Sequence, residues 1–210
     1  MKKIIDRSIH SAVLALAMLL TPMAVMADHD DDNNNNHNNK KPTVVEILSE
    51  VDGAQAVVAA VLVVDESGVL TVSLAELLGD KNAELVVLAP SNAAFEALLG
   101  LEPGTLDGLS VMDVKDALPG LLPPGVGPSE VAAILLKHVA QPPVAKFRTA
   151  SENALLGQGS IEVADGSVFA VSVGASGVAV NYETTIIKAN IRARNGIIHF
   201  IDTVIVDELL

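Results

Sequence analysis

The chain has 210 residues, enough for one folded domain, and it contains no cysteine. The lack of cysteine excludes disulfides, thiolate metal sites, a cysteine nucleophile and the acylated cysteine of a lipoprotein anchor. A formal net charge of −13 at pH 7 opposes binding to nucleic acid, whose phosphates it repels. Half of the residues are hydrophobic but only 2% are aromatic, so aliphatic side chains must fill the core.

Residues 1–27 have the layout of a cleaved secretory signal peptide. The segment starts with basic residues, continues with an apolar stretch from Ala12 to Leu20, and ends in the small-x-small sequence Ala-Val-Met-Ala. A membrane anchor is the alternative, but the apolar stretch is much shorter than the roughly 20 residues of a spanning helix. We therefore expect cleavage after Ala27, export to the periplasm or the extracellular space, and a mature chain that is not inserted in a membrane.

Residues 28–41, DHDDDNNNNHNNKK, contain no side chain that could join a hydrophobic core. This composition is typical of a disordered tether, and it places the folded domain at residues 42–210. The alternative is weak capture of Zn²⁺ or Cu²⁺ by imidazoles and carboxylates that nothing in the sequence orients. The side chains concerned are His29, Asp30, Asp31, Asp32 and His37.

Three helical stretches precede the first buried strand. Apolar residues within 43–51 recur every three or four positions, and Thr43 with Glu46 predicts an N-terminal capping box. Residues 54–64 are so uniformly apolar that they are compatible with a helix or a mixed segment. A turn at residues 65–68 and a short helix at residues 73–78 follow.

Residues 84–99, ELVVLAPSNAAFEALL, combine a strand with a helix. The aliphatic run Leu85–Leu88 predicts a strand buried on both faces, and Pro90 ends it because proline lacks an N–H group. Ser91 or Asn92 can then cap a helix. The core-facing side of this helix carries three residues, Phe95, Leu98 and Leu99.

Proline and glycine in residues 101–127 predict loops with one short helix at Val111–Leu118. Another helix begins at Pro128, and its periodicity places His138 on the buried face. We interpret His138 as a packed side chain that donates one hydrogen bond to the backbone. A role as a ligand or proton switch is the alternative.

From Gly157 onward the period changes to two, which indicates strands. Asp165-Gly166 predicts a two-residue hairpin turn, residues 174–177 predict another turn, and Asn195-Gly196 predicts a type I′ turn. The last strand is expected to carry His199 and Asp202. The expected strand segments are 161–163, 169–173, 178–180, 186–191 and 197–206.

Three stretches resemble fasciclin-type (FAS1) domains in the order of that family. They are VVLAPSNAAFEALL, ILLKHVA and NGIIHFIDTVIV, and together they cover about residues 43–206. The resemblance implies a mixed α/β fold, with a β-sheet core flanked by several helices. It also marks as family-motif residues Pro90, Ser91, Asn92, Phe95, His138, Asn195, Gly196, His199 and Asp202.

No pattern in the folded region indicates an enzyme. The residue types of a catalytic triad are present in Ser91, Asp202 and either His138 or His199. No G-x-S-x-G elbow exposes a serine, however. Two histidines without cysteine make a weak metal set, and a phosphate-binding glycine loop and an aromatic platform for sugars are both missing. We expect no catalytic residue, no cofactor and no metal.

The resemblance implies an exported adhesion module that acts in an extracellular matrix or biofilm through protein or cell-surface partners. Binding of a small apolar ligand, such as a lipid or carotenoid, between residues 54–64 and 101–127 is the alternative, and a hydrolase using Ser91 and His138 is a third hypothesis. The family usually has tyrosine where this chain has Lys137. The tyrosine-histidine pair is linked to integrin adhesion in animal relatives, so the resemblance does not extend that activity to this chain.

Overall fold

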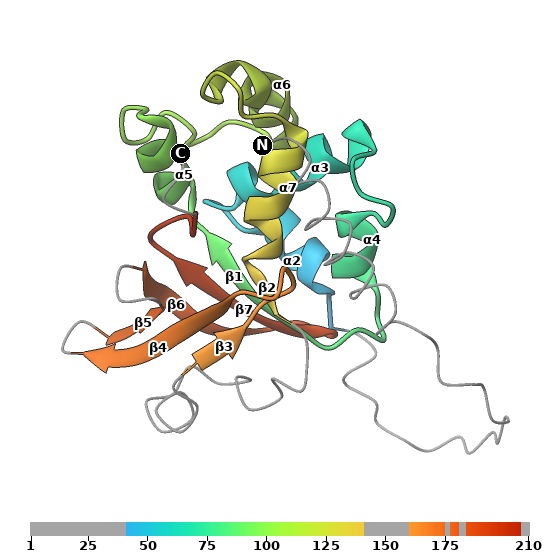
Figure 1. Ribbon diagram of the computed structural model, residues 1–210, viewed down its shortest axis with the longest axis vertical. Helices are drawn as coiled ribbons and strands as arrows, with labels where there is room; N and C mark the ends of the chain where they lie inside the picture. Colours follow the sequence, from blue (N-terminus) through green and yellow to red (C-terminus); the bar gives the residue numbers. More distant parts are fainter. Residues whose placement is uncertain (1–40, 141–159, 175–176, 181–183, 207–210) are drawn as a thin grey trace, which may run out of the picture.

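The computed structural model describes residues 41–140, 160–174, 177–180 and 184–206. The expected signal peptide, the candidate metal ligands of residues 29–37 and part of the expected turn at residues 174–177 lie outside the described residues. In Figure 1 the helices gather beside one face of a twisted sheet. Among the described residues, no helix combines the length and the apolar character that a membrane span requires.

Six helices are described, and their starts follow the sequence closely. The Glu46 carboxylate accepts hydrogen bonds from the N–H (2.6 Å) and the hydroxyl (2.9 Å) of Thr43, as expected for the glutamate of a capping box. The helices are α2 (Val44–Glu50), α3 (Gln55–Ser67), α4 (Leu74–Gly79), α5 (Asn92–Leu99), α6 (Val111–Leu121) and α7 (Pro128–Leu136).

Two helix ends differ from the prediction. Residues 65–67 belong to α3 rather than to a turn. The helix ends at Ser67, because Gly68 takes the left-handed conformation (φ 66°) that commonly follows the last helical residue. Asp65 then caps α4 by accepting from the N–H groups of residues 74 and 75. Helix α6 continues past Pro119, since the N–H of Leu122 still donates to the Leu118 carbonyl (3.2 Å).

In the described part of the chain, seven strands form one mixed sheet in the order β2-β1-β7-β6-β5-β4-β3, in which only the pair β1–β7 is parallel. The predicted mixed α/β fold, with helices against a sheet, is confirmed. The strands are β1 (Leu85–Pro90), β2 (Val139–Ala140), β3 (Ser160–Glu162), β4 (Val168–Gly174), β5 (Gly177–Val180), β6 (Thr184–Arg192) and β7 (Gly196–Ile201).

Strand β1 is buried along its whole length, as its aliphatic sequence predicts. Alternate residues enter two cores: Leu85 and Val87 join the large core between the sheet and the helices, and Val86 and Leu88 join a smaller core on the other face. Strand β7 alternates in the same way. A hydrogen bond from Ala164 N–H to the Val139 carbonyl (2.8 Å) links the two ends of the sheet and curls it around the smaller core.

Both predicted two-residue hairpin turns are wrong. Of Asp165 and Gly166 only the glycine has positive φ, and the Gly166 N–H donates to the Val163 carbonyl, so the loop is a wider turn ending in a left-handed glycine. Neither Asn195 nor Gly196 has positive φ, which excludes a type I′ turn. The last strand ends at residue 201 rather than 206, and Asp202 lies just beyond it.

Candidate functional site

The motif residues at the end of β1 fix the entry into α5. Ser91 is the cap: its hydroxyl accepts from the N–H of Ala94 (3.2 Å). Asn92 is not the cap but a buried cross-link, because its side chain accepts from Ala56 N–H (3.1 Å) and donates to Gln55 Oε1 (2.8 Å). These two positions therefore join β1, α5 and the start of α3.

Core packing and one unexpected carboxylate hold α5. Pro90 pairs with Ile201 at the end of β1, and Phe95 is buried in the large core, whereas residues 98 and 99 are only partly buried. Glu96 is buried too, which the apolar period did not predict. Its two oxygens accept from the N–H groups of residues 104 (2.9 Å) and 106 (2.7 Å), so it folds the following loop onto the helix.

Asn195 and Gly196 join three elements at the start of β7, opposite the end where Pro90 lies. The Asn195 side chain accepts from Val44 N–H (2.8 Å) and donates to the carbonyls of Leu78 and Asp80 (both 2.9 Å). Gly196 lies so close to Leu85 that an added Cβ would stand 3.0 Å from its carbonyl carbon. The Asn-Gly pair is therefore needed for side-chain bonding and close strand approach, not for a left-handed turn.

His138 is buried just after α7 and uses both ring nitrogens. Its Nδ1–H donates to the Ile134 carbonyl (2.7 Å), and Nε2 accepts from the Ile205 N–H (3.0 Å). This geometry requires the neutral ring, because a proton on Nε2 would remove the acceptor. Burial lowers the pKa of His138 from 6.5 to about 4, against the raising effect of the bond to Ile134.

Stability should therefore fall as the pH falls from about 7 to about 4. Below pH 6.5 the unfolded chain binds a proton on His138 that the folded protein does not bind. This difference lowers the free energy of unfolding by about 3 kcal/mol by pH 4. Denaturant unfolding at several pH values measures this slope. A His138→Asn variant, less stable at pH 7, should show a shallower slope, and equal slopes would contradict the assignment.

The histidine and the aspartate of the third motif both accept hydrogen bonds from backbone N–H groups. His199 is buried in β7, where its Nδ1 accepts from the N–H of Asn190 (3.2 Å). Asp202 lies just beyond β7, and its carboxylate accepts from the N–H of Thr185 (2.7 Å). The bonds of Ser91, His138 and Asp202 therefore lead to three different parts of the backbone and do not link the three side chains as a triad.

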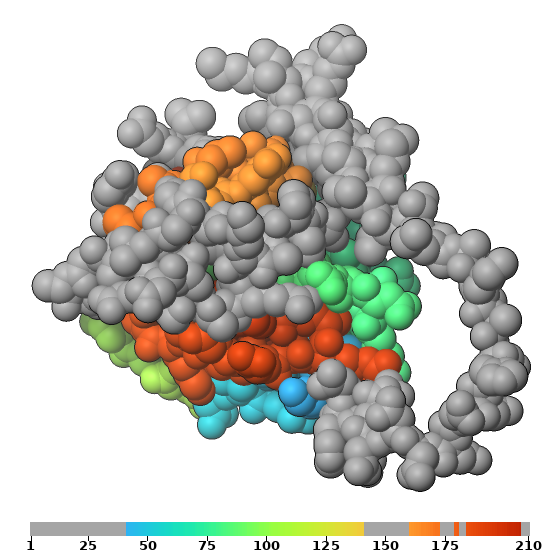
Figure 2. All heavy atoms as spheres, turned by 90° about the horizontal axis from the view of Figure 1, so that it is seen from below, coloured from blue at the N-terminus to red at the C-terminus, as the bar shows by residue number. Residues whose placement is uncertain are grey.

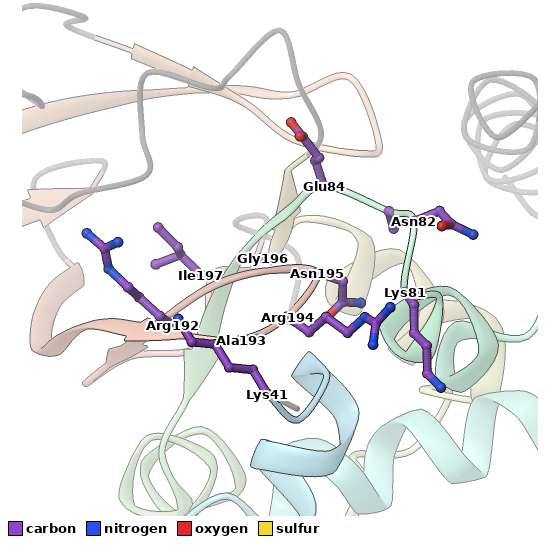
Figure 3. A pocket seen from close by; sticks show the side chains of 11 residues that line it. Lys41, Lys81, Asn82, Glu84, Arg192, Ala193, Arg194, Asn195, Gly196 and Ile197 are labelled. Atoms are coloured by element: carbon purple, nitrogen blue, oxygen red, sulfur yellow. The ribbon is translucent and has the colours of Figure 1, made fainter. Parts of the chain in front are cut away.

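A basic pocket of about 420 Å³ opens where the β6–β7 loop meets the chain before α2 and the α4–β1 loop. It is defined by Lys41, Lys81, Arg192 and Arg194, and Glu84 also lines it. Figure 3 shows Arg192 and Lys41 on one side and Arg194 and Lys81 on the other. Seen from below, the red strands border the blue start of the described chain in this region (Figure 2).

The position of the basic pocket follows from the backbone. The N–H of Leu85 donates to the Asn195 carbonyl (3.0 Å), and the N–H of Arg194 donates to the Pro42 carbonyl (2.8 Å). These bonds hold three segments that are distant in sequence against one another. The pocket could not be predicted from the sequence, because its four basic residues do not form a run and only the fold assembles them.

A comparison with family models matches residues 67–207 to the fasciclin domain. The chain belongs to the fasciclin domain family. No curated protein matches it. Fasciclin domains are generally associated with cell adhesion and protein interaction, are commonly extracellular, and are typically not enzymes.

This fasciclin domain has a buried ion pair where its second motif departs from the family pattern. Lys137 Nζ lies 2.7 Å from Asp165 and 3.2 Å from the Ser167 hydroxyl, and both charged side chains are largely buried. Burial raises the pKa of Asp165, but hydrogen bonds from Lys137 and Ser167 outweigh it and leave the pKa below its usual value. The pair fastens α7 to the β3–β4 turn.

Proposed function

We propose that this fasciclin domain is an exported interaction module that acts in adhesion through protein or cell-surface contacts. The observation that carries the proposal is the use of the motif side chains. Ser91, Asn92, His138 and Asn195 each make hydrogen bonds within the fold, so the motifs serve as a scaffold and leave recognition to the surface. Family membership supports the same conclusion.

The export part of the proposal rests on the signal-peptide pattern of residues 1–27. Cell fractionation and N-terminal sequencing of the mature protein test it. Release into the periplasm or the medium with Asp28 as first residue is expected. A protein that keeps its first 27 residues and stays in the cytoplasm would contradict export.

Deleting the gene and scoring cell aggregation and biofilm tests the adhesion part. Loss of either property, restored by the intact gene, is the expected result, and unchanged behaviour would contradict it. A pull-down from the host envelope with the protein lacking its first 27 residues would then identify the partner. An immobilised sample of the same protein unfolded by heat controls for capture by exposed apolar segments.

The described residues give less support to binding of an apolar ligand. Residues 54–64 and the buried residues of α6 pack into the same core, and the apolar crevice between Val86, Val171 and Val180 has a volume of only about 10 Å³. A lipid or carotenoid needs far more space. Extracting the protein purified from its host and recording its visible absorption tests this alternative, which a bound lipid or pigment would favour.

A further inference from the structure

The basic pocket is the strongest concentration of positive charge in the described part of an acidic protein. Seven lysines and arginines lie in the described ranges, and four of them line this one pocket. The other three are Lys115, paired with Glu66 and Asp116, Lys137, paired with Asp165, and Lys188 on β6. The formal net charge of the whole chain is −13.

Two carboxylates moderate the charge of the basic pocket without cancelling it. Glu84 lies in the lining, and Glu46, near Lys81 and Arg194, is already committed to its capping bonds with Thr43. The lining therefore combines four basic side chains with one carboxylate. Lys41, Lys81 and Arg192 are exposed, so their charged groups are accessible from solvent.

We propose that the basic pocket binds a short acidic peptide segment of a partner protein, with carboxylates from neighbouring residues set between the lysine and arginine groups. The proposal rests on the proposed function, because it gives the chemistry of the partner that an interaction module would hold. Arginine suits a carboxylate ligand, because one guanidinium group can bind a carboxylate through two parallel N–H donors. The pocket is lined by two arginines, Arg192 and Arg194. The volume of about 420 Å³ fits a few side chains.

The charge distribution favours a short peptide over a long polyanion or an anionic membrane. Salt screening limits the interaction between exposed charges to a distance of about 8 Å at physiological ionic strength. A short bound segment therefore interacts mainly with the cations of the pocket. A nucleic acid or a lipid surface extends beyond the pocket and meets the net negative protein.

Fluorescence anisotropy with labelled hexaglutamate and the exported protein tests the proposal. Saturable binding that weakens by about tenfold between low and physiological salt is expected, with hexaglutamine not binding. Replacing two cations, as in Arg192→Gln with Arg194→Gln, should weaken binding by about tenfold. The double variant Lys41→Gln with Lys81→Gln should weaken binding by a similar factor, because it removes the cations that the chain before α2 and the α4–β1 loop contribute.

The matched control is Lys115→Gln with Lys188→Gln, which removes the same charge outside the basic pocket. Equal weakening by this control would show a net-charge effect and overturn the proposal. Unchanged binding in both pocket variants, or equal binding of hexaglutamine, would also overturn it. So would displacement of hexaglutamate by inorganic phosphate at lower concentration than by unlabelled peptide, which would make the pocket a phosphate site. Thermal unfolding of each variant checks that it is folded.

The same variants separate this proposal from the proposed function. If deletion of the gene abolishes aggregation and the pocket variants restore it fully, adhesion stands and the basic pocket is not its site. If deletion has no effect while the purified protein binds hexaglutamate through the pocket, the peptide site stands and adhesion fails.

Discussion

A Gly196→Ala variant should lose about 3 to 5 kcal/mol of folding stability, a large part of the roughly 5 to 15 kcal/mol that keeps a typical domain folded. The added Cβ would stand 3.0 Å from the Leu85 carbonyl carbon and 3.1 Å from its Cβ. Relief requires separating β1 from β7, the parallel pair of the sheet. Differential scanning calorimetry or denaturant unfolding followed by far-ultraviolet circular dichroism measures the loss.

Gly120→Ala is the matched control for this substitution. Gly120 lies in α6, has no atom within 4 Å of an added Cβ, and does not have positive φ. Alanine there should raise stability by about 0.5 to 1 kcal/mol, because it lowers the entropy cost of the helix. A Gly196→Ala protein as stable as the wild type would show that β1 and β7 do not approach as closely as described.

Removing one member of the Lys137–Asp165 pair should cost about 3 kcal/mol. In Lys137→Met the Asp165 carboxylate loses its cation, and in Asp165→Ala the more deeply buried ammonium group loses its anion. The loss should be larger for Asp165→Ala, because Lys137 has the less exposed side chain of the two. Urea unfolding at pH 7 gives both values.

Two comparisons make the result specific to the buried pair. The double variant Lys137→Met with Asp165→Ala should be more stable than the sum of the single losses predicts, because it leaves no isolated charge. Lys115→Met, which breaks the more exposed pair with Glu66, should cost much less than Lys137→Met. Equal losses at Lys115 and Lys137 would mean that burial does not strengthen the pair.

The parts of the fold that depend on local pattern could be predicted from the sequence. The aliphatic run of β1, the cap at Ser91 and the helix from Pro128 are each specified by a few neighbouring residues, and the structure places them as expected. Family membership was also predictable, because its motifs are contiguous in the chain. The burial of His138 follows from the same helical period.

The errors and the features that were not predicted concern contacts outside the local pattern. Asn195-Gly196 has the composition of a type I′ turn, but bonds to Val44, Leu78 and Asp80 and the proximity of β1 give it another conformation. Glu96 and Lys137 are charged residues that a local pattern assigns to the surface. Each is buried because its partners come from another segment, the loop after α5 for Glu96 and the β3–β4 turn for Lys137.

The parallel pairing of β1 with β7 has a consequence for the order of folding. More than half of the chain separates Leu85 from its partner Gly196, so this parallel pair cannot form until almost the last residues are available. Contacts of such long range slow folding and leave the early aliphatic segments without partners during synthesis. An incomplete chain truncated before β7 would leave one edge of β1 unpaired and would be a target for chaperones and proteases.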